Sequence, residues 1–261
     1  MLQAAGMKAG ALPELLNFDE PQVITDIQRQ YVEAGCDVIT ANTFGANAHK
    51  LDGAATVADA FAAAVTCARE AGARYVAGDI GPIGALLRPL GTLSFDEAYD
   101  LFAEEVRAGI DAGVDIFIIE TMTDLAEIKA AVLACRENSD LPVFATMTFE
   151  EDGRTFLGTS PEVAAITLDA IGADVLGINC SQGPAELRGL AARMLTVTDK
   201  PVMVQANAGL PHVDDDGNTV FDIQAPEYAK AVAGMIEDGV SVVGGCCGTT
   251  PAHMAALRTL I

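Results

Sequence analysis

The chain has 261 residues, of which 51% are hydrophobic, and 37 acidic against 15 basic residues give it a formal net charge of -22. This length and apolar content are enough to bury a large core, and the negative charge argues against nucleic acid and anionic membranes as partners. The sequence shows neither an apolar run of membrane-spanning length nor the pattern of a signal peptide, so we expect a cytoplasmic protein that does not contact a membrane. Six cysteines are too few for a disulfide scaffold, and a reducing compartment would keep their thiols available for metal.

A repeated unit runs along the chain, in which a helical stretch ends at a glycine and an apolar strand follows. Glycine commonly ends a helix because it adopts the left-handed conformation without steric cost. Helix starts are also marked: Ser94 and Glu97 predict a capping box, and the prolines after Glu20, Ser160 and Thr250 suit a first helical turn. The repeated unit occurs at residues 34–38, 71–75, 112–116, 171–175 and 238–242.

Strands that alternate with helices predict a parallel sheet, and each predicted strand is apolar, as expected for a strand covered by helices. In chain order, the predicted strands lie near residues 37–43, 75–80, 114–120, 142–148, 174–180, 201–207 and 240–245.

Polar or reactive side chains follow the carboxyl ends of these strands. In a (β/α)8 barrel, those ends form one rim that carries the active site. We therefore predict an α/β fold of the (β/α)8 TIM barrel type, whose mouth gathers three cysteines, Glu120 and Asn207. The alternative is a doubly wound open sheet, which would spread the strand ends along a line. The side chains in question are those of Asn42, Thr43, Asp79, Glu120, Thr121, Thr148, Asn179, Cys180, Asn207, Cys246 and Cys247.

Two adjacent cysteines stand in the segment Gly-Gly-Cys-Cys-Gly-Thr-Thr-Pro at 244–251, and a third closes Gly-Ile-Asn-Cys at 177–180. On a regular strand, Cys246 and Cys247 would point to opposite faces, but the flanking glycines let the backbone leave the strand. Three thiolates suit zinc. No histidine stands beside a cysteine as in a zinc finger, so we expect the fourth coordination position to be open. The three histidines are His49, His212 and His253.

The remaining cysteines, His253 and an acidic segment are not expected to bind metal. Cys36, Cys67 and Cys135 are predicted to be packing residues. His253 is expected to face solvent or the helix end. The acidic segment 214–217 is interpreted as a solvated Asp-Gly hairpin, because the rest of a calcium-binding loop is missing.

The two cysteine segments together resemble the zinc signature of the homocysteine S-methyltransferase family. The resemblance extends over nearly the whole chain, and its detail is most similar to the homocysteine-binding barrel of cobalamin-dependent methionine synthases. The shorter matching segments are Asn-Thr-Phe at 42–44, Gly-Asp-Ile-Gly-Pro at 78–82, Glu-Thr at 120–121, Met-Thr-Phe at 147–149 and Asn-Ala-Gly at 207–209.

The resemblance implies a zinc-bearing barrel that methylates the thiol of homocysteine in methionine biosynthesis. It implies that Cys180, Cys246 and Cys247 bind zinc and that the homocysteine sulfur takes the open position. Glu120 resembles the residue that meets the substrate ammonium group, and Asn207 is a candidate to line the pocket or occupy the zinc. Further substrate-binding candidates are Asn42, Asp79 and Asn179. The methyl donor it implies is methylcobalamin, carried by a corrinoid-binding domain or protein.

The cysteine pattern and two of the candidate residues also have other interpretations. A methyltransferase that uses betaine or S-methylmethionine, and a noncatalytic zinc- or thiol-binding module, both fit the cysteine pattern. Glu120 would equally serve as an ion-pair partner at the rim, and Asn207 as a bridge between loops.

The start of the chain departs from the family. The family's first barrel strand, with its Asp-Gly-rich segment, precedes the Met-Leu-Gln found here at residues 1–3. We therefore expect residues 1–261 to form one homocysteine-binding zinc barrel domain that is N-terminally truncated and lacks its first strand.

Overall fold

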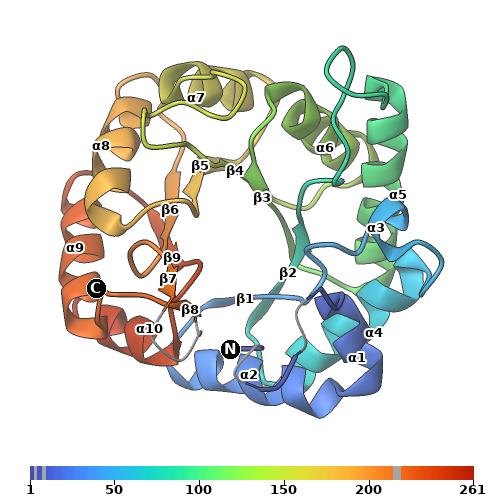
Figure 1. Ribbon diagram of the computed structural model, residues 1–261, viewed down its shortest axis with the longest axis horizontal. Coiled ribbons are helices and arrows are strands. Elements are labelled where there is room, and N and C mark those ends of the chain that lie inside the picture. The colour runs from blue at the N-terminus through green and yellow to red at the C-terminus, as the bar shows by residue number, and fades with distance from the viewer. Residues whose placement is uncertain (3–4, 8–9, 214–218) are drawn as a thin grey trace. The chain divides into compact units, whose positions relative to one another are not determined.

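The computed structural model describes residues 1–2, 5–7, 10–213 and 219–261 (Figure 1). Its strands are β1 (Val38–Thr40), β2 (Tyr75–Ile80), β3 (Ile116–Met122), β4 (Val143–Met147), β5 (Val175–Asn179), β6 (Val202–Ala206), β7 (His212–Val213), β8 (Thr219–Val220) and β9 (Val242–Gly245). Its helices are the 3-10 helix η1 (Pro13–Leu15) and the α-helices α1 (Leu16–Asp19), α2 (Pro21–Glu33), α3 (Ala48–Leu51), α4 (Val57–Glu70), α5 (Phe95–Ala112), α6 (Leu125–Asn138), α7 (Pro161–Ala170), α8 (Pro184–Leu195), α9 (Ala225–Glu237) and α10 (Pro251–Arg258).

The main sheet has seven strands in the hydrogen-bonded order β1-β2-β3-β4-β5-β6-β9. Pairing is parallel in β1–β2, β2–β3, β5–β6 and β6–β9. Each strand of this sheet therefore lies beside the strand of the same sheet that precedes it in the chain, and the order never reverses as it does in a doubly wound sheet. This is the topology of a (β/α)8 barrel with one strand fewer, so the predicted fold class and its strands are confirmed.

The helix boundaries follow the local sequence signals. Ser94 forms the predicted capping box with Glu97 at the start of α5, and proline occupies the first turn of α2, α7 and α10. The glycines that were predicted to end helices all have positive φ angles, for example 84° at Gly113 and 94° at Gly172. Only glycine adopts this conformation without cost, which is why each helix stops where it does.

Chain contacts divide the fold into two compact units. Unit 1 comprises Met1–Met122 and Ala126–Phe144, and unit 2 comprises Thr123–Leu125 and Ala145–Ile261. In unit 1, α4 packs against α2, α5 and β2. Its core includes the fully buried rings of Phe61, Phe102 and Phe117. Gly78 and Gly109 lie against the Phe117 ring, where a side chain would crowd it.

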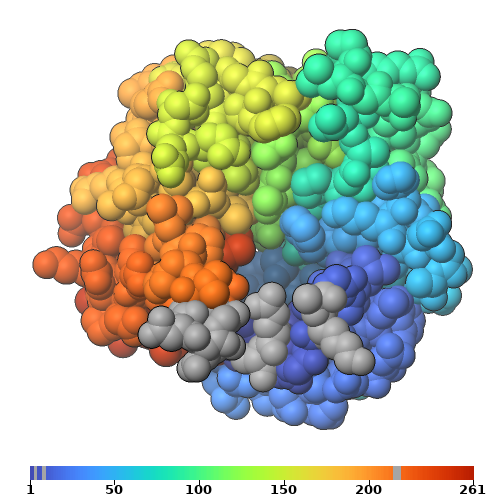
Figure 2. All heavy atoms as spheres, viewed as in Figure 1, coloured from blue at the N-terminus to red at the C-terminus, as the bar shows by residue number. Residues whose placement is uncertain are grey.

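In unit 2, helices α7, α8 and α9 lie along one side of β5, β6 and β9 (Figure 1). Helix α9 packs against both α8 and α10. Figure 2 shows α7 and the loop before it at the surface in yellow-green, and this loop includes Phe156, which is 67% exposed. Strands β7 and β8 form a short antiparallel pair between β6 and α9. The predicted Asp-Gly hairpin at 214–217 lies outside the described residues.

None of the helices in the described part of the chain combines the length and the apolar character needed to cross a membrane.

Candidate functional site

Three cysteine sulfur atoms converge in unit 2. The Sγ atoms of Cys180, Cys246 and Cys247 all lie within 4.8 Å of one another, and those of Cys180 and Cys247 are 3.8 Å apart. Sulfur ligands about 2.3 Å from a tetrahedral zinc ion stand about 3.8 Å from each other, so the sulfur spacing fits this metal. Within the described residues, this trio is the one group of metal-ligand side chains that meets the spacing.

A strained backbone turn presents Cys180 at the end of β5. Cys180 and Ser181 have φ angles of 62° and 65°, in the left-handed region that non-glycine residues rarely adopt. The N–H of Cys180 still donates to the carbonyl of Gln205 at 3.0 Å, so β6 holds the turn in place. Such strain is typical of functional sites, where the surrounding structure enforces it.

The Cys246-Cys247 segment leaves β9 through a tight turn, as its glycines predicted. The Cys246 N–H donates to the Ala206 carbonyl at 2.9 Å, and the Thr249 hydroxyl donates to the Cys246 carbonyl at 2.7 Å. A side chain at Gly245 would collide with Thr249. The turn therefore depends on a glycine at this position.

Gly248 is a second required glycine in this turn. Its φ angle is 79°, and a side chain there would collide with the ring of Phe221. The conformation and the lack of space both exclude a larger residue.

Asn207 bridges the two cysteine segments. Its Oδ1 accepts a hydrogen bond from the Cys247 N–H at 3.0 Å, and its side chain also hydrogen-bonds the Cys180 thiol. The neighbouring Ala208 N–H donates to the Cys247 carbonyl at 2.9 Å. Asn207 therefore contacts two predicted zinc ligands and bridges their loops. A bridge between loops was one of the roles considered for it from the sequence.

Hydrogen bonds to its sulfur favour the thiolate form of Cys180. Its donors, in order of effect, are the thiols of Cys246 and Cys247, the backbone of Ser181 and the side chain of Asn207. Together they lower the pKa of the Cys180 thiol from its ordinary value of 9.0 to about 3, although burial opposes the shift. Metal binding requires thiolates, so this environment suits a cation.

Asn179 lies beneath the turn and is fully buried. Its Oδ1 accepts from the Thr146 hydroxyl at 2.9 Å, and its backbone carbonyl accepts from the Thr148 hydroxyl at 3.0 Å. These bonds join the carboxyl ends of β4 and β5. Asn179 thus supports the segment that carries Cys180.

The other predicted substrate residues, Asn42, Asp79 and Glu120, belong to unit 1. Asn42 donates to the Pro13 carbonyl at 2.8 Å and to Asn17 Oδ1 at 3.0 Å. Asp79 is buried, and burial followed by the negative charge of Glu120 raises its pKa well above the ordinary value of 3.8. These interactions place the Asp79 and Glu120 carboxyl groups near each other in unit 1.

Unit 1 also buries a carboxyl group that the sequence analysis did not single out. Glu105 on α5 is fully buried, and neither of its side-chain oxygens has a hydrogen-bond partner. Burial raises its pKa well above the ordinary 4.5, and the positive charge of Lys50 only partly offsets this. The sequence does not reveal this burial, because Glu105 stands beside a second glutamate, Glu104, which is exposed.

Two of the predicted packing cysteines and the histidine of α10 are buried. Cys67 and Cys135 are buried free thiols, as predicted for packing residues. His253 was expected to face solvent or the helix end, and of these two it does not face solvent: it is 8% exposed, and its ring packs edge-on against Tyr228 at 5.4 Å. It does sit at the helix end, where it completes a capping box with Thr250.

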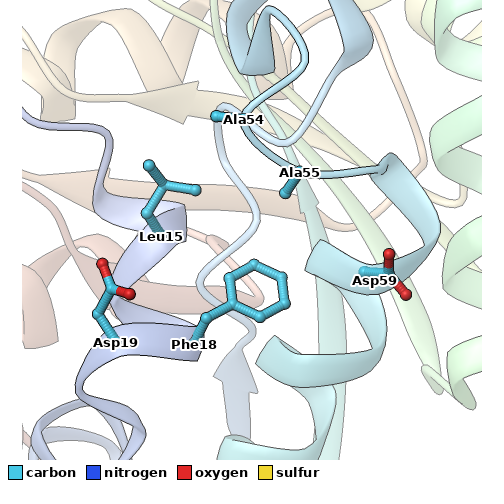
Figure 3. Close-up of a pocket in the computed structure, with 6 residues that line it drawn as sticks. All are labelled: Leu15, Phe18, Asp19, Ala54, Ala55 and Asp59. Atoms are coloured by element: carbon cyan, nitrogen blue, oxygen red, sulfur yellow. The ribbon is translucent and has the colours of Figure 1, made fainter.

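Figure 3 shows an open pocket in unit 1, between the segment η1–α1 and the start of α4. The ring of Phe18 and the side chain of Leu15 form part of its wall (Figure 3). None of its lining residues was predicted to belong to the site. They are Leu15, Phe18, Asp19, Ala54, Ala55 and Asp59.

Comparison with known proteins gives a family match over the whole chain. The family model described as homocysteine S-methyltransferase matches residues 1–261. The methionine synthase of Mycobacterium tuberculosis (strain ATCC 25618 / H37Rv) is 38% identical over 266 residues, which cover 95% of this chain and 22% of that protein. The methionine synthase of Mycobacterium leprae (strain TN) is 37% identical over 265 residues, with the same coverage of 95% and 22%. The chain thus spans about a fifth of the length of these relatives.

Solved structures share the fold. The homocysteine methyltransferase MmuM from Escherichia coli in its metallated form aligns with a TM-score of 0.81 and 22% identity, over 99% of this chain and 92% of that one. Its oxidized form aligns with a TM-score of 0.83 and 21% identity, over 99% and 91%.

Proposed function

The chain belongs to the homocysteine S-methyltransferase family, and from this premise we propose that it transfers a methyl group to the sulfur of homocysteine, giving methionine, at a zinc site formed by Cys180, Cys246 and Cys247. The observation that carries the proposal is the convergence of these three sulfur atoms, which come from two strand ends far apart in the sequence. Three protein ligands leave one position of a tetrahedral site for a substrate atom, as in other catalytic zinc sites.

The chain's own residues prepare the reaction by holding the ligands in position. Asn207, the strained turn at Cys180 and the carbonyl of Ala206 fix the cysteine backbones, so little reorganisation is needed when metal and substrate bind. A zinc ion held by Cys180, Cys246 and Cys247 would lower the pKa of the homocysteine thiol, so that the thiol would lose its proton to solvent at neutral pH. The sulfur would then form the new bond to the methyl carbon, and the donor would keep the electron pair of the bond that breaks.

We further propose that Glu120 binds the ammonium group of homocysteine. The support is its match to the family position and its place at the carboxyl end of β3. Asp79 is a weaker candidate for that role, because its raised pKa favours the uncharged acid. Asn42 and Asn179 are proposed to shape the site through their hydrogen bonds.

The methyl donor in this proposal is methylcobalamin, presented by a corrinoid-carrying domain or protein. Its support is that the relatives named methionine synthase extend far beyond the region shared with this chain. Betaine or S-methylmethionine is the alternative donor. A reducing cytoplasm is the proposed setting, since all six cysteines are free thiols.

A metal-binding experiment tests the zinc site. The purified chain, reconstituted with zinc, should hold about one ion per chain, and cobalt substitution should give the sulfur-to-metal absorption of a thiolate site. Added homocysteine should increase that absorption, because a further sulfur joins the metal. A cobalt spectrum that homocysteine leaves unchanged, in a chain that binds metal, would support the noncatalytic module.

An assay with different methyl donors tests the proposal that methylcobalamin is the donor. With zinc and homocysteine present, the chain should form methionine from methylcobalamin and not from betaine or S-methylmethionine. Methionine formed from either small donor at a comparable rate, without a corrinoid, would favour the alternative donor.

A further inference from the structure

Tyr228 of α9 is a fully buried side chain in unit 2 whose hydroxyl reaches the backbone of two strands. Its Oη lies 2.7 Å from the Gly244 carbonyl and 3.1 Å from the Ala206 carbonyl. Burial raises its pKa above the ordinary 10.0, so the hydroxyl keeps its proton and acts as a donor. A phenol has only one hydrogen, so the shorter bond, to Gly244, is the principal one.

The two carbonyls stand immediately before the metal-binding segments. Gly244 lies on β9 two residues before Cys246, and Ala206 ends β6 immediately before Asn207. Ala206 also accepts the N–H of Cys246 at 2.9 Å. The Tyr228 hydroxyl thus donates mainly to β9 and lies close to the end of β6, where β9 leads into the cysteine turn and β6 leads into Asn207.

His253 fixes the tyrosine ring from the side. The two rings meet nearly at right angles, at 86°, with 5.4 Å between their centres. Nε2 of His253 lies 3.0 Å from the Ile223 carbonyl and must donate to it, because a carbonyl only accepts. Nδ1 therefore accepts from the Thr250 N–H at 3.2 Å, which also anchors the start of α10.

We propose that Tyr228 is a positioning residue of the metal centre: its hydroxyl, bonded mainly to Gly244, anchors the end of β9 to α9 and so aims Cys246 and Cys247 at the metal, with His253 holding the ring. The inference rests on the proposed zinc-dependent function and adds a residue to it. Tyr228 touches neither metal nor substrate in this role, and it acts through the backbone. Groups that orient metal ligands in this way typically contribute 10-fold to 100-fold to affinity or activity.

The test is Tyr228→Phe, which keeps the buried ring and removes only the hydroxyl. We expect its zinc affinity, measured by competition with a chelator, to fall on the order of 10-fold. We also expect the absorption bands of the cobalt-substituted variant to shift, because the sulfur atoms no longer hold the same geometry. The matched control is Tyr99→Phe on α5, which removes a hydroxyl bonded to Glu137 in unit 1 and should leave zinc affinity and spectrum unchanged.

A second variant covers the case in which Tyr228→Phe does not fold. His253→Gln removes the ring that packs on Tyr228 and should weaken metal binding in the same direction. Identical zinc affinity and cobalt spectra in wild type and in a folded Tyr228→Phe protein would overturn this inference and leave the zinc function standing. A wild-type chain that binds no zinc would instead overturn the proposed function itself.

Discussion

The side-chain oxygen of Asn207 accepts a hydrogen bond from the backbone N–H of Cys247 at 3.0 Å. The same side chain also hydrogen-bonds the Cys180 thiol. Asn207 follows β6, while the two cysteines follow β9 and β5, so one residue joins three neighbouring strand ends. The proposed metal site is therefore held in place by the strand ends around it.

Asn207→Ala should weaken zinc binding, because it leaves the Cys247 N–H without its acceptor and removes a donor to Cys180. We expect a loss of about 10-fold in zinc affinity, measured by chelator competition. Asn138→Ala, at the end of α6 in unit 1, is the control and should bind zinc as wild type does. Equal zinc affinity in the Asn207 and Asn138 variants would contradict the bridging role.

Serine replacement separates the three ligand cysteines from the packing cysteines. Cys180→Ser, Cys246→Ser and Cys247→Ser should each lower the zinc content and abolish methyl transfer, because each thiolate supplies a large part of the affinity. Cys67→Ser and Cys135→Ser should keep the zinc, since both thiols are buried in the core of unit 1, whereas the three candidate ligands belong to unit 2. Zinc content would be read by elemental analysis, and full occupancy in Cys246→Ser would remove that residue from the ligand set.

Gly248→Ala should destabilise unit 2 and lower the zinc content. The residue has a φ of 79°, and the added carbon would collide with Phe221, so the turn after Cys247 must shift. Gly189→Ala is the matched control, because it lies within α8 with no atom in the way of the added carbon. Alanine there should stabilise the helix by about 0.5–1 kcal/mol. Thermal unfolding and zinc analysis would check both, and unchanged zinc in Gly248→Ala would show that the turn tolerates a side chain.

Glu105→Gln should reduce the dependence of stability on pH. The folded-state pKa of Glu105 is raised by burial, so its contribution is complete below the ordinary pKa of 4.5 and is lost as pH rises toward the folded-state value. Over that window, one such group lowers the free energy of unfolding by up to about 1.4 kcal/mol per pH unit. Glutamine does not ionise, so the variant should lose less stability as the pH rises above the ordinary glutamate pKa of 4.5.

Denaturant unfolding at several pH values would measure this difference, with Glu104→Gln as the exposed neighbour on the same helix. The pKa of Asp79 is also raised, so the Glu105→Gln variant should still lose some stability as the pH rises. Parallel pH profiles for wild type and Glu105→Gln would show that Glu105 does not stay protonated in the folded chain.

The sequence by itself predicted the strands and helices and the convergence of three cysteines. Local signals, such as the capping box at Ser94 and the glycines that end helices, marked the helix ends. The seven main strands also lie where they were predicted, although β1 spans only Val38–Thr40 of the predicted 37–43. The convergence of Cys180 with Cys246 and Cys247 also followed, because parallel strands bring their carboxyl ends to one edge and the glycines beside the cysteines free the backbone.

Only the tertiary structure decided which side chains support that site. Nothing in the sequence marks Tyr228 and His253 as neighbours, yet their rings pack against each other. The sequence also does not indicate that Glu105 is buried while its neighbour Glu104 is exposed. The physical reason is the same in each case: these contacts join segments far apart in the chain, and local sequence signals act over only a few residues.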